Sequence, residues 1–127
     1  MYLFSIALTS CSYGATVNYG DVVRFPNVKT NYGLQNLTLF KQTGIFTCEQ
    51  KGLYMFFSSM MSHTAEGFLR WYLKNPHSLS AIYVGNHDDY QSGSGMVTIE
   101  LDVGDTVFFK SRIRVDPSSC CTLIKIK

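Results

Sequence analysis

The chain has 127 residues, a length typical of one domain that can bury its own apolar core. Hydrophobic residues make up 46% of it and charged residues only 16%, a balance that argues against a disordered chain. The net charge of +2 comes from scattered lysines and arginines, so we expect no nucleic-acid partner. No apolar run approaches the roughly 20 residues of a membrane-spanning helix, and no membrane insertion is expected.

The chain begins with an apolar segment that has two interpretations. Leu3–Thr9 predicts a first strand, followed by a turn at Tyr13-Gly14. The same segment resembles the apolar part of a short signal peptide, but no positively charged residue precedes it. We therefore prefer the strand.

The next segment combines a short strand with a loop. Val22–Phe25 predicts a strand that stops at Pro26, because proline has no N–H to donate to a ladder. Residues 31–36 have the composition of a loop. The triplet Asn36-Leu37-Thr38 is an acceptor sequence for N-glycosylation, which has meaning only if the protein is secreted.

Residues 46–61, FTCEQKGLYMFFSSMM, hold two strand-like runs. Ile45–Glu49 and Leu53–Ser62 predict two strands, broken at Lys51-Gly52. Side chains alternate along a strand, and both faces of the second one are apolar. One face holds Leu53, Met55, Phe57 and Met61, and the other holds Tyr54, Phe56 and Met60. A second sheet should cover one face and a partner subunit the other, which predicts a β-sandwich that oligomerises.

The segment from Thr64 to Lys74 has both helical and strand spacing. Its aromatic content, the internal Gly67 and the terminator Asn75-Pro76 favour a strand. Leu79–Val84 predicts a further short strand, and residues 85–95 a polar loop.

The last third of the chain alternates most regularly. Val97, Ile99 and Leu101 alternate with polar residues, and Asp102–Asp105 predicts a tight turn. Val107 and Phe109 begin the next strand, and Thr122, Ile124 and Ile126 share one face of the last. Short strands with frequent turns and no clear helix predict an all-β sandwich or barrel.

Four cysteines, Cys11, Cys48, Cys120 and Cys121, are too few and too unevenly spaced for a disulfide scaffold or a zinc site. Cys48 is expected as a buried free thiol, with one bridge from Cys48 to the last strand as the alternative. Cys120 and Cys121 should point to opposite faces of a strand and should not bridge each other.

No catalytic motif is present. The three histidines, His63, His77 and His87, lie in separate segments without metal-ligand spacing. The sequence contains neither a framed nucleophile nor a phosphate-binding loop. We therefore predict a non-enzymatic protein.

Several motifs occur in the order found in one family. One pattern resembles the second half of the signature of the complement C1q globular head domain: Phe46, five residues, Gly52, one residue, Tyr54, one residue and Phe56. Phe25 followed by Asn31 is similar to the first half of that signature. Further matches are Phe4-Ser5 with Leu8, Leu73-Lys74-Asn75, Ser92–Val97, and Leu101 with Gly104-Asp105 and Val107. The resemblance covers nearly the whole chain. One departure is that the family's closing F-S-G-F reads Cys120-Cys121-Thr122-Leu123 here.

This resemblance implies a fold and an assembly. It implies a single domain over residues 1–127, folded as a ten-stranded jelly-roll β-sandwich, secreted and assembled as a homotrimer. We expect Tyr54 and Phe56 near the three-fold axis, with Phe108 on a neighbouring strand.

One polar loop has the character of a calcium site. Carboxylate, amide and backbone oxygens are the ligands that calcium prefers. Asp89 lies where calcium-binding members of the family have an aspartate, and Asp88 and Gln91 are the other candidate ligands. The alternative is a solvated loop in which these residues only make turns.

The resemblance implies a recognition function. The expected function is lectin-like pattern recognition in innate immunity, with microbial polysaccharide or lipopolysaccharide as ligand. Candidate contact residues are His87 and Tyr90 in the polar loop, and Arg112 and Arg114, which suit anionic groups such as lipid A phosphates or serve only solubility. The alternatives are a cytokine-like or hormone-like ligand for a cell-surface receptor, and a structural role in shell or matrix assembly.

Overall fold

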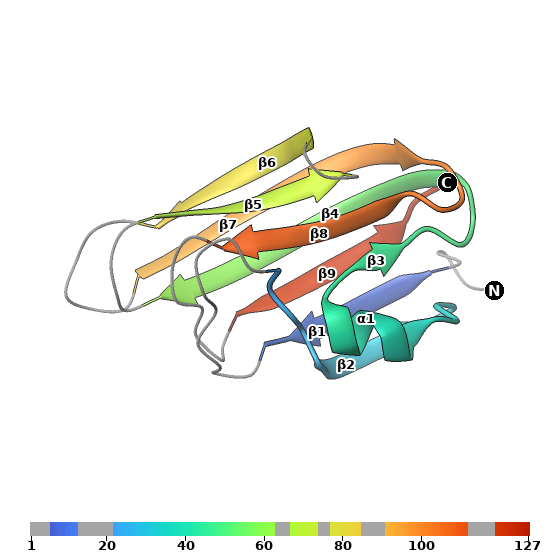
Figure 1. Ribbon diagram of the computed structural model, residues 1–127, viewed down its shortest axis with the longest axis horizontal. Helices are drawn as coiled ribbons and strands as arrows, with labels where there is room; N and C mark the ends of the chain where they lie inside the picture. Colours follow the sequence, from blue (N-terminus) through green and yellow to red (C-terminus); the bar gives the residue numbers. More distant parts are fainter. Residues whose placement is uncertain (1–5, 13–21, 63–66, 74–76, 85–90, 112–118) are drawn as a thin grey trace.

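The computed structural model describes residues 6–12, 22–62, 67–73, 77–84, 91–111 and 119–127 (Figure 1). In these residues there are nine strands and one short helix. The strands are β1 (Ala7–Cys11), β2 (Asn27–Tyr32), β3 (Phe46–Thr47), β4 (Gly52–Ser62), β5 (Gly67–Leu73), β6 (His77–Val84), β7 (Gln91–Leu101), β8 (Thr106–Ser111) and β9 (Cys120–Lys125), and the helix is α1 (Leu37–Thr43).

The strands form two sheets that pack as a sandwich (Figure 1). The five-stranded sheet, sheet A, has the order β2-β1-β9-β4-β7, and the four-stranded sheet, sheet B, has the order β3-β8-β5-β6. The last strand, β9, lies between β1 and β4, so strands far apart in the sequence are neighbours. This arrangement is consistent with the expected jelly roll, although the ten expected strands are not confirmed.

The core between the sheets is built around the residues of the family signature. The Phe46 ring lies 5.6 Å from the ring of Tyr54 and 5.7 Å from that of Phe56, measured between centroids. Tyr54 and Phe56 have no exposed surface. Their burial removes large aromatic side chains from water, which is the main source of stability in such a fold. The signature therefore specifies the core of the subunit.

The two faces of β4 have different roles. Tyr54 and Phe56 point inward, so Leu53, Met55 and Phe57 form the outward face. The expected position of Tyr54 and Phe56 near a three-fold axis stays a prediction, although neither side chain exposes any surface in the single subunit. The prediction that β4 is apolar on both faces is confirmed for Leu53 to Phe57.

The helix α1 was not expected from the sequence. Phe40 is buried in the same core cluster as Phe46 and Leu8, and the helix lies over β1 and β2 in Figure 1. Gly44 ends the helix in the left-handed conformation, with φ 76°, and donates its N–H to the Phe40 carbonyl at 2.8 Å. α1 thus adds apolar cover on the inner side of sheet A, where sheet B has only four strands.

The N-terminal part differs from expectation around Pro26. A first strand is confirmed, with Leu8 buried in the core, but β1 spans Ala7–Cys11, and residues 3–5 of the predicted strand lie outside the described part of the chain. Val22–Phe25 is not a regular strand; it contributes a single bridge between Val22 and Lys110. Strand β2 begins only after Pro26, where every residue can again donate an N–H.

The C-terminal strands largely follow the predicted pattern. Strands β5 and β6 are confirmed. Leu101 is buried, while Thr98 and Glu100 are exposed, as the alternation requires. Strand β7 begins earlier than expected, since the segment from Ser92 to Gly95 pairs with β4 instead of forming a loop. The long partner strand overrides the low strand preference of glycine and serine there.

One disulfide joins the first and last strands. Cys11 and Cys120 are cross-strand partners in β1 and β9, and their sulfur atoms are bonded. Cys48 and Cys121 are buried free thiols. The predicted free Cys48 is confirmed, as are the opposite orientations of Cys120 and Cys121, whereas the alternative of a bridge from Cys48 to the last strand is excluded.

Candidate interaction surface

The outer face of sheet A carries a patch of apolar side chains that no described part of the chain covers. Phe57 and Met96 are directly opposite each other on β4 and β7, with 39% and 59% of their surface exposed. Met55 is opposite Ile124 of β9, and both are partly exposed. With Leu53, these residues form what we call the outer patch (Leu53, Met55, Phe57, Met96 and Ile124).

Polar groups border the outer patch. Thr98 and Glu100 on β7 are exposed on the same face. On the other side, the hydroxyl groups of Thr9 and Thr122 are hydrogen-bonded at 3.0 Å. An apolar area with a polar rim is typical of a protein interaction site, because monomeric proteins seldom leave such an area in water.

Phe108 does not contribute to the outer patch. It lies on β8 in sheet B and is only 6% exposed. The Lys110 ammonium is 5.9 Å from the centre of its ring, a cation–π distance. The assignment of Phe108 to the subunit contact stays a prediction, as for Tyr54 and Phe56, with little of its side chain exposed in the single subunit.

Most candidate ligand and metal residues lie outside the described part of the chain: His87, Asp88, Asp89, Tyr90, Arg112 and Arg114. Gln91 is the first residue of β7, where its backbone is opposite Ser62. In the described residues no cluster of three histidine, cysteine, aspartate or glutamate side chains could hold a metal ion. The calcium site stays a prediction.

The strand ends next to both candidate segments lie at one end of the sandwich. β6 ends at Val84 opposite Gly67, and β7 starts at Gln91 opposite Ser62. β8 ends at Ser111, and β9 starts at Cys120 (Figure 1). The strand ends that flank residues 85–90 and 112–118 therefore lie at the same end of the sandwich, which we call the loop end.

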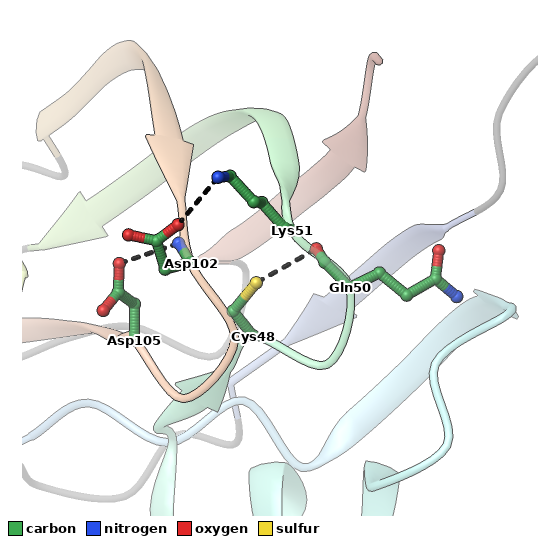
Figure 2. Close-up of polar contacts among 5 residues, drawn as sticks. All are labelled: Cys48, Gln50, Lys51, Asp102 and Asp105. Atoms are coloured by element: carbon green, nitrogen blue, oxygen red, sulfur yellow. Dashed lines mark hydrogen bonds and ion pairs between the residues drawn. The ribbon is translucent and has the colours of Figure 1, made fainter.

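At the opposite end, polar contacts join the loop before β4 to the turn after β7 (Figure 2). The backbone of Cys48 bonds to that of Asp105 and of Gly104, at 2.8 and 2.9 Å. The buried Asp105 carboxylate accepts the N–H of Asp102 at 2.9 Å. Gly104 takes a φ of 93°, which glycine adopts readily. The matched Gly104-Asp105 motif is thus a structural turn.

The buried Cys48 thiol has no catalytic character. It donates to the Gln50 carbonyl at 3.1 Å, and the Tyr54 hydroxyl donates to the same carbonyl at 2.6 Å. Burial raises the pKa of Cys48 above its ordinary value and also raises the pKa of Tyr54. Both groups are neutral at physiological pH, whereas a nucleophilic cysteine must be a thiolate.

A shallow hollow of about 550 Å³ lies beside this turn. The Lys51 ammonium and the Asp102 carboxylate form an exposed ion pair at 3.6 Å on its border. Such a solvated pair contributes little binding energy. The hollow mixes charges of both signs and does not define a ligand. It is lined by Lys51, Gly52, Leu53, Glu100, Leu101, Asp102 and Lys127.

The two-sheet topology, the signature core and the outer patch define a jelly-roll domain of the C1q and tumour necrosis factor type. The structure is similar to the globular domain of zebrafish complement 1qA protein, with a TM-score of 0.78 and 18% identity over 97% of this chain and 98% of that one. It is also similar to murine APRIL, with a TM-score of 0.72 and 13% identity over 94% of this chain and 98% of that one. A third similar structure is Eiger TNF from S. frugiperda, with a TM-score of 0.65 and 14% identity over 99% of this chain and 94% of that one. At these identities the likeness shows the fold.

The family of this chain is shown by its sequence. The model of the C1q domain family matches residues 3–119. The chain belongs to the C1q domain family. Domains of this family are typically secreted or extracellular, and they are generally recognition or ligand domains without enzymatic activity. The described residues include no helix of the length and apolarity needed to cross a membrane.

Proposed function

We propose that this protein is an extracellular pattern-recognition domain of innate immunity, acting as a homotrimer that binds microbial polysaccharide or lipopolysaccharide. The observation that carries the proposal is the match to the C1q domain over residues 3–119. Homologues of the C1q and tumour necrosis factor type form trimers and bind receptors or glycans. The outer patch supplies this chain with a surface suited to assembly.

The outer patch is the proposed subunit contact. A contact between different surfaces of identical subunits closes into a ring when each subunit is rotated by one third of a turn. Covering Phe57 and Met96 removes apolar area from water, at roughly 25 cal/mol for each Å². The interface therefore depends on apolar side chains that face outward, in place of Tyr54 and Phe56.

The assembly is tested by placing a charge in the outer patch. Phe57→Glu should give a folded monomer, because a carboxylate buried at the interface would have no partner. Val103→Glu is the matched control, since Val103 is 67% exposed on the turn after β7. Light scattering should give a trimer mass for the wild type and the control. A wild-type monomer at micromolar concentration would refute the trimer.

Three binding sites on one rigid assembly suit a repetitive surface. Linked weak sites raise the overall affinity by ~10²-fold to 10⁴-fold without any new contact, provided that they bind together. The loop end is the proposed ligand-binding end, with His87 and Tyr90 in one segment and Arg112 and Arg114 in the other. Loops on a rigid sandwich commonly carry binding residues.

Ligand binding is tested on immobilised lipopolysaccharide and mannan, with calcium and with a chelator. Arg112→Ala with Arg114→Ala should weaken binding to lipopolysaccharide more than to mannan, because arginine pairs with phosphate. Loss of mannan binding in chelator would support a calcium site at Asp88, Asp89 and Gln91. If the wild-type trimer binds neither surface, pattern recognition is refuted.

The second candidate is a cytokine-like ligand for a cell-surface receptor. It is favoured by the likeness to murine APRIL and to Eiger TNF, which cover 94% and 99% of this chain. Saturable binding of the trimer to animal cells, without binding to either microbial surface, would support this function over the first.

A further inference from the structure

We propose that Asn36 carries an N-linked glycan. Asn36-Leu37-Thr38 has the asparagine, the non-proline residue and the threonine that the transfer requires. It is the one such triplet in the 127-residue sequence, because no other asparagine is followed two residues later by serine or threonine. The function proposed above does not use this triplet.

The structure places the triplet at the solvent-exposed start of α1. Asn36 and Thr38 are exposed at the start of α1, between strand β2 and the core helix residue Phe40. A glycan is bulky and hydrophilic, so an acceptor asparagine must face solvent in the folded protein. This requirement is met at Asn36.

A hydrogen bond from its own N–H holds the backbone of Asn36 in place, and the Asn36 side chain does not cap the helix. The Glu49 carboxylate accepts the N–H groups of Asn36 and Gln35, at 2.7 and 3.1 Å. An asparagine that precedes a helix commonly caps it with its side chain. Asn36 makes no such bond and has the unusual φ and ψ of −96° and 51°. A glycan on the side-chain nitrogen would therefore cost the helix no hydrogen bond.

A second feature points to the compartment where this modification occurs. The Cys11–Cys120 disulfide is of the kind that forms in the oxidising secretory pathway and persists outside the cell. Domains of the C1q family are typically extracellular. The inference rests on this location and not on the identity of the ligand.

The proposed reaction needs a lipid-linked oligosaccharide pyrophosphate as donor. The side-chain amide nitrogen of Asn36 forms a bond to the first sugar carbon and loses one proton. The bond from that carbon to the pyrophosphate oxygen breaks, and the lipid pyrophosphate leaves. No electrons are gained or lost in this transfer.

The position suggests what the glycan does for the fold. Asn36 follows by four residues the end of β2, which is an edge strand of sheet A. Exposed edge strands can pair with other chains, and bulky or charged groups oppose this. α1 lies on the inner side of sheet A, whereas the outer patch faces away from it. A glycan at the start of α1 leaves the outer patch free for assembly.

The test expresses the full chain behind a cleavable secretion leader in animal cells and examines the secreted protein. The wild type and Thr38→Ser should each run as one glycosylated species, which peptide N-glycosidase reduces to the polypeptide mass. Asn36→Gln and Thr38→Ala should be secreted at that polypeptide mass from the start. Thr38→Ser is the matched control, because it keeps the acceptor sequence.

Peptide mapping after enzymatic release should locate the site, because release converts the glycosylated asparagine to aspartate. Detection of this change at position 36 supports the proposal. Secreted, disulfide-bonded wild type without a glycan would overturn it. A glycan that persists in Asn36→Gln would overturn it as well. Because Asn36 does not cap the helix, this variant should fold, and its thermal unfolding checks that it does.

Discussion

Replacing Cys11 and Cys120 together by alanine should strongly destabilise the subunit. The two residues are opposite each other on β1 and β9, and they are 109 positions apart in the sequence. The disulfide therefore closes nearly the whole chain into a loop. In the unfolded state this loop restricts the chain severely, whereas in the native state β1 and β9 are already paired, for example at Ala7 and Ile124.

The magnitude follows from the loop length. Chain-entropy arguments assign a disulfide that closes about 100 residues a stabilisation of about 4.7 kcal/mol. A domain is stable by roughly 5–15 kcal/mol in total, so this single bond supplies a large share. For a chain of this size the loss lowers the melting temperature by an amount on the order of 10–20 °C.

Denaturant unfolding at one fixed protein concentration measures the effect. The wild type should lose stability when a reductant is added, whereas Cys11→Ala with Cys120→Ala should be unaffected by it. Equal unfolding midpoints for the oxidised wild type and the double variant would refute the reasoning. So would peptide mapping that finds Cys120 bonded to a different cysteine.

Two glycines and two thiols give further predictions. Gly44→Ala should lower the unfolding free energy several times more than Gly104→Ala, which should lower it by about 1 kcal/mol. Both glycines have positive φ, but only at Gly44 would an added Cβ meet the Val23 carbonyl oxygen, 2.2 Å away. Equal unfolding free energies for the two variants would contradict this. Burial raises the pKa of Cys48 and Cys121, so the unfolded state releases their protons first as pH rises above about 9. The unfolding free energy should therefore fall between pH 8 and pH 10, and less steeply in Cys48→Ala with Cys121→Ala; a flat profile in the wild type would contradict this.

The strands could be predicted from the sequence, but the direction in which β4 faces could not. Alternation separates Tyr54 and Phe56 from Met55 and Phe57, and both sets are apolar. Which set points inward depends on the position of sheet B, which the local pattern does not contain. The Tyr54 hydroxyl reaches the Gln50 carbonyl, so even its polar atom is satisfied inside the core.

The helix was missed because its signals are short. Leu37 and Phe40 are spaced for one helical face, and Gly44 is suited to end a helix. Seven residues hold too few turns for a periodic pattern to stand out. The disulfide was missed for another reason: β1 and β9 become neighbours only through the sheet order, which sequence spacing does not show.

The candidate site was predicted only in part. An apolar outward face on the strand β4 was expected, and the structure shows one, made of Leu53, Met55 and Phe57; its use in assembly stays a proposal. The expected loop residues lie outside the described part of the chain, so their roles stay predictions.

The hydrogen bond from the Lys125 N–H to the Ile6 carbonyl, at 3.0 Å, places the first and last described parts of the chain side by side, away from the loop end. The domain thus has two different ends, one next to Ile6 and Lys125 and the other the loop end. A bead, a label or a carrier protein attached close to Ile6 or close to Lys125 would occupy the same side. Either attachment would leave the loop end pointing outward, so binding measured on an immobilised sample should not depend on which of the two positions is used.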